Sequence, residues 1–109
     1  MRIGVTGASG LVGFNFCELA QSNGNQLNIL IRKDIDYLKK INAKKFYGNL
    51  DDIETLEKFC TGCEVIIHSA AMISIGLDSH DDVYQVNYIG TKNLLKACIK
   101  KKVKKFIFI

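Results

Sequence analysis

Near the start of the chain, glycine recurs at every third position, directly behind a short apolar stretch. The segment reads Thr6-Gly7-Ala8-Ser9-Gly10-Leu11-Val12-Gly13 and follows Met1-Arg2-Ile3-Gly4-Val5. A strand that passes through a glycine-rich turn into a helix presents backbone N–H groups at the positive end of the helix dipole, and these groups favour a bound pyrophosphate. The spacing therefore predicts that this turn cradles the phosphates of a dinucleotide.

The three glycines are expected to differ in what they do. By analogy with the dinucleotide-binding turn, Gly7 allows the tight reversal and Gly10 lets a phosphate approach the backbone, while Gly13 lets the helix pack close to the strand. The hydroxyls of Thr6 and Ser9 are candidate additional hydrogen-bond partners. An ordinary glycine-rich turn is the alternative, but the position between a strand and an amphipathic helix favours the phosphate site.

Two cations at the end of the second predicted strand bear on which dinucleotide the turn would hold. The apolar run 27–31 is followed by Arg32 and Lys33, and the first acid is Asp34. A site selective for NAD places an acid here for the ribose 2′-hydroxyl, whereas a site for NADP replaces it with a cation for the 2′-phosphate. A guanidinium can fork onto a phosphate and stack on adenine. Arg32 therefore favours NADP, with NAD as the alternative if Asp34 reaches back to the ribose.

Apolar runs and helical periodicities alternate along the chain and predict the framework for these residues. Strands are predicted at 3–5, 27–31, 45–47, 64–68 and 106–109, with helices at 11–23, 35–41 and 53–60 and a long helix from about 79 to 97. Strands separated by helices predict a parallel sheet covered on both faces. The glycine turn selects an α/β fold of the Rossmann type, a doubly wound sheet with five strands in the order 3-2-1-4-5.

Local patterns also predict how the helices begin and pack. Asp51 and Glu54 have capping-box spacing, and Asp34 is a candidate N-cap for the segment 35–41. Gly90 is expected to let the long helix lie close to the sheet. The helix 11–23 is expected to bury one stripe, formed by Val12, Phe16, Leu19 and Ala20.

Length and composition fit one domain, residues 1–109, with 48% apolar residues and a net charge of +4. No stretch approaches the roughly 20 apolar residues of a membrane span, and no secretory pattern opens the chain. A cytoplasmic protein with reduced thiols and no membrane association is therefore expected. Cys60 and Cys63 have redox or zinc spacing, but without a second ligand pair a structural role is favoured.

The basic run 100–105 is a candidate nucleic-acid contact. No aromatic residue interleaves with its lysines for base stacking, so a solvated helix end is favoured and no nucleic-acid partner is expected. The apolar strand 106–109 would leave a sheet edge open. We therefore expect the sheet to be incomplete at its C-terminal side, and to be covered by a missing C-terminal half or by another copy in a homo-oligomer.

Four motifs, in order, resemble the N-terminal half of the extended short-chain dehydrogenases/reductases, the superfamily that includes nucleotide-sugar epimerases and dehydratases. They are the glycine turn 6–13, Gly48-Asn49-Leu50, His68-Ser69-Ala70-Ala71 and Val86-Asn87-Tyr88-Ile89-Gly90-Thr91-Lys92-Asn93-Leu94-Leu95. The resemblance implies cofactor contacts by the backbone of Leu11, Val12 and Gly13, by Asn49 and Leu50 beside the adenine, and by Ala70 and Ala71 on the ribose and nicotinamide side. Asn49 replaces the usual Asp, and its side-chain oxygen is expected to accept a weaker hydrogen bond from the adenine amine.

The resemblance also implies a catalytic Ser or Thr after strand five and a Tyr-x-x-x-Lys on the following helix, with the tyrosine as acid and base. Neither position lies within residues 1–109, so no catalytic residue is expected here. Tyr88 and Lys92 have the spacing but precede strand five. His68, on a buried strand, is expected to be a hydrogen-bonded core residue.

The expected function is therefore the NADP(H)-binding portion of an oxidoreductase, epimerase or dehydratase that acts on a small alcohol or carbonyl substrate. Arg32 and the Ala70-Ala71-Met72 segment are most similar to dihydroflavonol-reductase and hydroxysteroid-dehydrogenase relatives. The alternative is a non-catalytic module that senses NAD(P).

Overall fold

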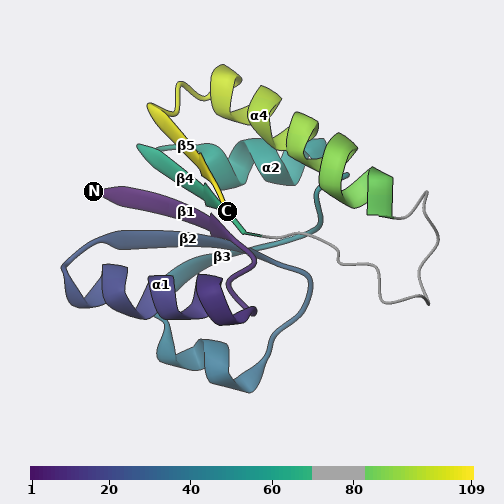
Figure 1. Ribbon diagram of the computed structural model, residues 1–109. Helices are drawn as coiled ribbons and strands as arrows, with labels where there is room; N and C mark the ends of the chain where they lie inside the picture. The colour runs from purple at the N-terminus through teal and green to yellow at the C-terminus, as the bar shows by residue number, and fades with distance from the viewer. Residues whose placement is uncertain (70–82) are drawn as a thin grey trace.

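The computed structural model describes residues 1–69 and 83–109, and these form a five-stranded parallel sheet in the order β3-β2-β1-β4-β5 (Figure 1). The predicted α/β fold and strand order are confirmed. Because all strands are parallel, their carboxyl ends meet at one edge of the sheet. The elements are β1 (Arg2–Thr6), α1 (Leu11–Ser22), β2 (Gln26–Ile31), the 3-10 helix η1 (Asp36–Lys40), β3 (Ala43–Tyr47), α2 (Ile53–Cys60), β4 (Val65–His68), the π-helix η2 (Gln85–Gly90), α4 (Thr91–Lys100) and β5 (Lys105–Phe108).

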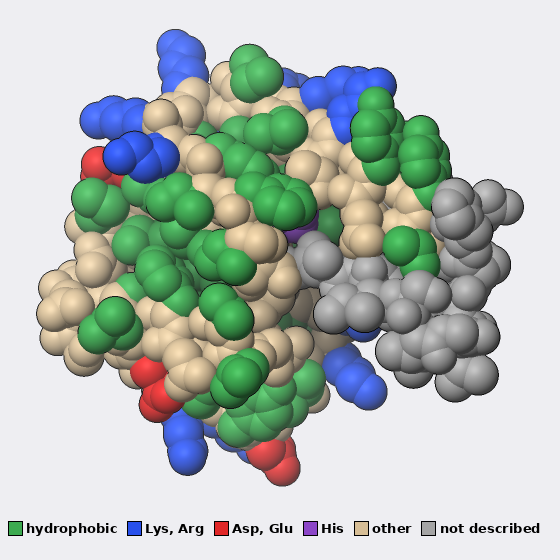
Figure 2. All heavy atoms as spheres, viewed as in Figure 1, with side chains coloured by type: hydrophobic (Ala, Val, Ile, Leu, Met, Phe, Trp, Pro, Cys, Tyr) green, Lys and Arg blue, Asp and Glu red, His purple; other side chains and the backbone are tan. Residues whose placement is uncertain are grey.

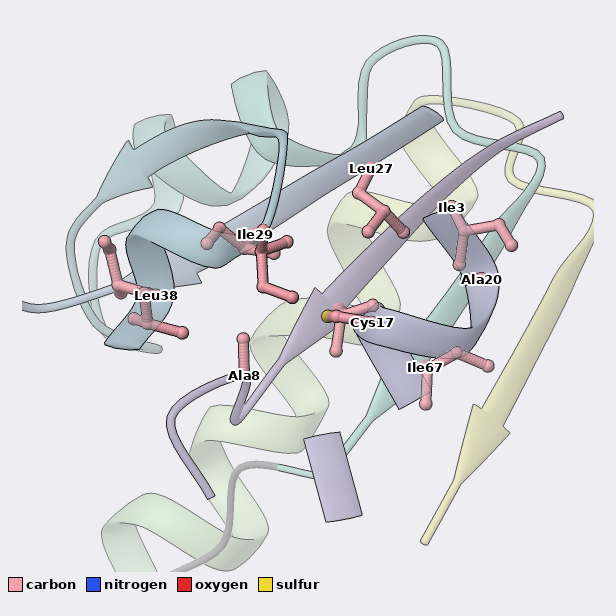
Figure 3. Packing of buried hydrophobic residues seen from close by; sticks show 11 residues of the cluster. Ile3, Ala8, Cys17, Ala20, Leu27, Ile29, Leu38 and Ile67 are labelled. Carbon is pink, nitrogen blue, oxygen red and sulfur yellow. The ribbon is translucent and has the colours of Figure 1, made fainter. Parts of the chain in front are cut away.

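Helices cover both faces of the sheet, with α1 and η1 on one side and α2 and α4 on the other (Figure 1). Alternate residues of each strand enter different cores because side chains alternate across a strand. The core under α1 and η1 contains Ile3, Val5, Ala8, Cys17, Ala20, Leu27, Ile29, Ile31, Leu38, Ile41 and Ile67, most of them labelled in Figure 3. The core under α2 and α4 contains Leu30, Leu50, Leu56, Phe59, Cys60, Cys63, Ile66, Leu94, Ala97 and Cys98.

The predicted buried stripe of α1 is wrong in two of its four positions. Val12 is 53% exposed and Leu19 is 62% exposed, whereas Ala20 is buried and Phe16 is partly buried. The buried residues of α1 are Gly13, Cys17 and Ala20. These residues are small, so the helix lies close to the sheet, and the exposed large apolar residues of α1 are Leu11, Val12 and Leu19.

Two predicted helix starts are also wrong. The N-cap of α2 is Asp52 rather than Asp51, because the Asp51 N–H donates to Asn49 Oδ1 (2.8 Å) and closes a turn before the helix begins. Asp52 then accepts hydrogen bonds from the Thr55 backbone N–H (3.2 Å) and hydroxyl (2.7 Å). The segment predicted to begin after Asp34 is the 3-10 helix η1, which follows Ile35 and has no side-chain cap.

Gly90 allows a close approach, but to Leu50 rather than to a strand. A Cβ on Gly90 would lie 2.8 Å from Leu50 Cβ. Asn93 Nδ2 donates to the Leu50 carbonyl (3.0 Å), so the helical segment η2–α4 is fixed against the β3–α2 connection. The predicted start of the long helix near Ser79 lies outside the described residues.

The edge strand β5 pairs with β4 alone among the described strands. Ile107, Phe108 and Ile109 are 41%, 59% and 55% exposed. Apolar side chains gather on the surface between α1 and this edge (Figure 2). Among the described residues, no helix is both long and apolar enough to span a membrane.

Candidate functional site: a cavity at the carboxyl ends of the strands

A cavity of about 820 Å³ opens at the carboxyl ends of β1, β2 and β3. Three predicted segments meet there, contributing Gly7, Ser9 and Gly10, then Arg32, then Asn49 and Leu50. The strand order reverses at β1, and crevices at such a point are where open α/β sheets bind ligands. The sheet thus joins residues about 40 positions apart in the sequence, as the parallel arrangement requires.

Two of the three glycines in the turn are explained by the backbone conformation and the packing of the protein itself. Gly7 has φ +72°, which is strained for any other common residue. A Cβ on Gly13 would lie 2.1 Å from the Gly7 carbonyl oxygen, so α1 could not keep its position with a larger residue there. A Cβ on Gly10 would meet only the Gly7 carbonyl oxygen, at an ordinary 3.4 Å. Packing within the described residues therefore does not explain the glycine at position 10.

The N-terminus of α1 is open toward the cavity. Its N-cap is Gly10, which supplies no side-chain hydrogen bond. The first hydrogen bond of the helix runs from the Phe14 N–H to the Gly10 carbonyl (2.9 Å), so the N–H groups of Leu11, Val12 and Gly13 have no partner within the helix. Free N–H groups at the positive end of a helix dipole are a common place for phosphates to bind.

Positive charge lines the cavity beyond β2, where Arg32 and Lys33 both contribute to its wall. The nearby acid Asp34 is held elsewhere, since its Oδ1 accepts a hydrogen bond from the Tyr47 hydroxyl (2.8 Å) and lies 3.9 Å from Lys45 Nζ. The Asp34 hydrogen bond raises the pKa of Tyr47, which keeps this phenol protonated as the donor. Asp34 is not among the residues that line the cavity.

Asn49 lies at the cavity wall, but its side-chain oxygen already accepts the Asp51 N–H. Asp51 lines the same wall and was not predicted as a site residue. The sequence did contain a signal for this turn, because an Asn side chain commonly accepts the backbone N–H two residues further along in an Asx turn. Lys33 and Ser69 also line the cavity and were not predicted. The predicted residues Ala70 and Ala71 lie outside the described residues.

A chain of hydrogen bonds links Thr6, which directly precedes the glycine turn, through His68 to Thr91. The Thr91 hydroxyl donates to the Asn87 carbonyl (2.9 Å), so its oxygen must accept from His68 Nε2 (2.9 Å). Burial lowers the pKa of His68 to about 4, so the neutral ring carries its proton on Nε2. His68 Nδ1 therefore accepts the Thr6 hydroxyl (2.6 Å). His68 is 2% exposed, which confirms the predicted hydrogen-bonded core histidine.

The far side of the turn has two further supports. Ser69 donates its N–H to Thr6 Oγ1 (3.1 Å) and its hydroxyl to the Thr6 carbonyl (2.6 Å). The Tyr37 hydroxyl, from η1, donates to the Ser9 carbonyl. The Tyr37 ring packs edge-on against Phe14 at a centroid distance of 5.2 Å. The turn is thus fixed by β4 and η1 while its cavity side stays open.

The model of the NAD dependent epimerase/dehydratase family matches residues 3–109 of this sequence. The chain belongs to the NAD dependent epimerase/dehydratase family. Among solved members of this wider fold group, it is similar to UDP-glucose 4-epimerase from Thermotoga maritima, with 30% identity and a TM-score of 0.88, over 99% of this chain and 37% of that one. It is also similar to a short-chain dehydrogenase/reductase superfamily protein from Agrobacterium tumefaciens with bound NAD, with 25% identity and a TM-score of 0.86, over 99% of this chain and 32% of that one.

Curated relatives of this chain include proteins of different kinds. A 4-hydroxy-2-methyl-3-oxo-4-farnesyl-3,4-dihydroquinoline-1-oxide ketoreductase from Stigmatella aurantiaca is 27% identical over 100% of this chain and 33% of the relative. The photosystem II assembly factor Ycf39 from Cyanophora paradoxa is 36% identical over 99% of this chain and 33% of the relative. The chain therefore spans about a third of the length of these relatives. Together these findings support a cofactor-binding portion of an oxidoreductase-type protein.

Proposed function

We propose that residues 1–109 form the NADP(H)-binding portion of an oxidoreductase, epimerase or dehydratase that acts on an alcohol or carbonyl substrate. The nicotinamide ring of such a cofactor supplies or accepts a hydride. This chain's own residues bind and orient the dinucleotide: the N–H groups of Leu11, Val12 and Gly13 face its phosphates, and Arg32 faces its adenosine end. The residues that act on the substrate are proposed to lie outside residues 1–109.

One observation carries the dinucleotide proposal, namely the space at Gly10. The protein accommodates a Cβ at this position without a clash, yet glycine occupies it at the uncapped start of α1. A phosphate held by the first-turn N–H groups would fill that space. Gly7, Ser9 and Gly10 all face the cavity, so the residues present fit a dinucleotide at this turn.

The preference for NADP(H) follows from the charges at the end of β2. Arg32 and Lys33 line the cavity, whereas the Asp34 carboxylate is engaged by Tyr47 and Lys45 away from it. An NAD-selective site needs an acid that reaches the ribose hydroxyls. With that acid held elsewhere, a 2′-phosphate would meet two cations and gain charge-assisted hydrogen bonds from the guanidinium. NAD(H) remains the alternative cofactor.

The decisive experiment compares the binding of NADPH and NADH by calorimetry. We expect NADPH to bind at least tenfold more tightly, and Arg32→Ala to remove most of that difference by weakening NADPH alone. Lys39→Ala is the matched control, because Lys39 is an exposed cation that pairs with Asp36 (3.5 Å) and does not line the cavity. Equal affinities of the unaltered chain for the two cofactors would contradict the NADP preference, and no binding of either would contradict the whole proposal.

A second candidate function is a non-catalytic module that binds NAD(P) for structural or regulatory purposes. It is favoured by the relative with 36% identity, which is named as an assembly factor rather than as an enzyme. The two functions predict the same cofactor affinity but differ in turnover. A search of the full-length protein for cofactor oxidation or reduction with panels of alcohols and ketones separates them, since a sensor would bind NADPH without consuming it.

A further inference from the structure

Two cysteines face each other across the contact between α2 and α4. Cys60 is the last residue of α2 and Cys98 lies in the last turns of α4, and these helices pack side by side on one face of the sheet (Figure 1). The Cys60 and Cys98 sulfur atoms are 3.9 Å apart, and the two residues are 0% and 5% exposed. Both thiols are free.

The other two cysteines are arranged differently. The Cys63 thiol donates to the Phe59 carbonyl (3.4 Å) and accepts from Asn28 Nδ2 (3.3 Å), although the spacing in the sequence would pair it with Cys60. Cys17 belongs to the core under α1, on the opposite face of the sheet. Of the four cysteines, all of which lie among the described residues, only Cys60 and Cys98 have a sulfur–sulfur contact.

We propose that Cys60 and Cys98 form a reversible disulfide that joins α2 to α4 when the protein meets a peroxide. A disulfide requires a sulfur–sulfur distance of about 2.05 Å, so the two atoms must approach by about 2 Å. The Lys100–Glu57 ion pair (3.1 Å) already joins the same two helices beside the thiols.

Either thiol can donate to the other across this contact. The contact lowers the pKa of Cys98 and raises that of Cys60, so we assign the attack on the peroxide to Cys98. The Cys98 thiolate attacks one peroxide oxygen, an S–O bond forms and the O–O bond breaks, and the released hydroxide takes a proton to become water. The Cys60 sulfur then attacks the Cys98 sulfur, the S–S bond forms, and the S–O oxygen leaves as a second water with the Cys60 proton. Two thiols are oxidised and one peroxide is reduced.

The bond would restrain the helix that reaches the cofactor cavity. On the same helical segment, Thr91 accepts from His68 and Asn93 donates to Leu50, which lines the cavity. A disulfide at Cys98 therefore restrains α4, the same helix that contacts the cavity wall through Asn93. The oxidised protein is expected to unfold at a higher temperature than the reduced protein.

The test exposes the reduced chain to stoichiometric hydrogen peroxide, blocks the remaining thiols under denaturing conditions, and maps the peptides by mass spectrometry. We expect the loss of two hydrogen atoms, two blocked thiols instead of four, and a Cys60–Cys98 cross-linked peptide that dithiothreitol releases. Cys60→Ser and Cys98→Ser should each abolish this product. Cys17→Ser is the matched control and should leave it intact, because Cys17 is a buried cysteine in the other core.

Three results would overturn the proposal. The first is a linkage between Cys60 and Cys63, the second is four thiols still available after peroxide, and the third is sulfinic acid as the main product. Mapping of the unaltered chain distinguishes these results from the expected one even if a serine variant fails to fold. None of these readouts depends on cofactor binding, so the result is independent of the proposed function.

Discussion

Two strand-to-helix connections border the same cavity, and they differ in whether side chains satisfy the backbone N–H groups at the start of the helix. In the β3–α2 connection, Asn49 accepts the Asp51 N–H and Asp52 caps Thr55, so side chains of the protein satisfy the start of the helix. In the β1–α1 connection, Gly10 offers no side-chain cap and itself lines the cavity. The comparison shows that the same strand-to-helix connection leaves its first N–H groups available for a ligand when no side chain caps the helix.

The open connection needs support that the capped one does not. Its glycines remove side chains, and its shape is instead maintained from behind by Thr6, His68 and Ser69, together with the Tyr37 contact to Ser9. Hydrogen bonds from neighbouring elements thus hold the shape of the turn where no side chain caps the helix. Substitutions in the two connections should therefore separate stability from cofactor binding.

The largest effect on the free energy of unfolding is expected at Gly13, where the β1–α1 connection has no space for a side chain. Gly13→Ala places a Cβ within 2.1 Å of the Gly7 carbonyl oxygen, and relieving this contact requires a backbone shift. We expect the free energy of unfolding to fall by about 3 kcal/mol, measured by urea denaturation. Gly10→Ala is the control in the same turn and should change it by less than about 1 kcal/mol. Equal losses in the two variants would show that the turn does not have the observed packing.

The buried support of the open turn predicts a pH dependence of stability. The pKa of His68 is lowered to about 4 in the folded chain, so between pH 6.5 and 4 the unfolded chain binds a proton that the folded chain does not. Stability from this residue is therefore complete above about pH 6.5 and falls as the pH drops toward 4, by about 3 kcal/mol in total.

Urea denaturation at a series of pH values measures this loss, with His68→Gln as the variant that cannot titrate. The difference in unfolding free energy between the two chains should shrink as the pH falls from about 6.5 to about 4. Parallel profiles for the two chains would contradict the buried, neutral state of His68.

At Gly10, the expected effect is on binding rather than on folding. Gly10→Ala adds a methyl group in the space proposed for a phosphate, and NADPH affinity should fall at least tenfold, or about 1.4 kcal/mol, in a calorimetric titration. In the capped β3–α2 connection, by contrast, Asp52→Ala is expected to leave NADPH affinity unchanged. Unchanged NADPH affinity in Gly10→Ala would contradict a phosphate bound at this turn.

The smallest effect is expected at the capped helix. Asp52→Ala removes the acceptor for Thr55, so the thermal unfolding midpoint should fall by a few degrees while NADPH affinity stays unchanged. The Thr55 hydroxyl lowers the pKa of Asp52, so the stability that this cap contributes is lost as the pH falls through that lowered value. Scanning calorimetry at neutral and acid pH measures both parts. A loss of NADPH affinity in this variant would mean that the two connections are coupled.

Much of the fold was predictable because its signals are local. The alternation of apolar runs with helical periodicities predicted all five strands. The glycine turn predicted their order and marked the turn at the cavity. The predicted stripe on α1 was wrong because periodicity does not indicate which side of a helix must approach a sheet closely. The close packing at Gly13 was expected, but its contact with the Gly7 carbonyl oxygen, which fixes the side of the helix that faces the sheet, is visible only in the structure.

Residue types and their short-range spacing by themselves determined the parallel sheet, the glycine turn and the family of this protein, because strands, turns and caps depend on a few neighbouring residues. Only the tertiary structure decided which partners distant polar groups take. Asp34 is held by Tyr47, His68 links Thr6 to Thr91, and Cys60 meets Cys98 rather than Cys63. Such pairings depend on the register of strands and the packing of helices far apart in the chain, and no local pattern encodes them.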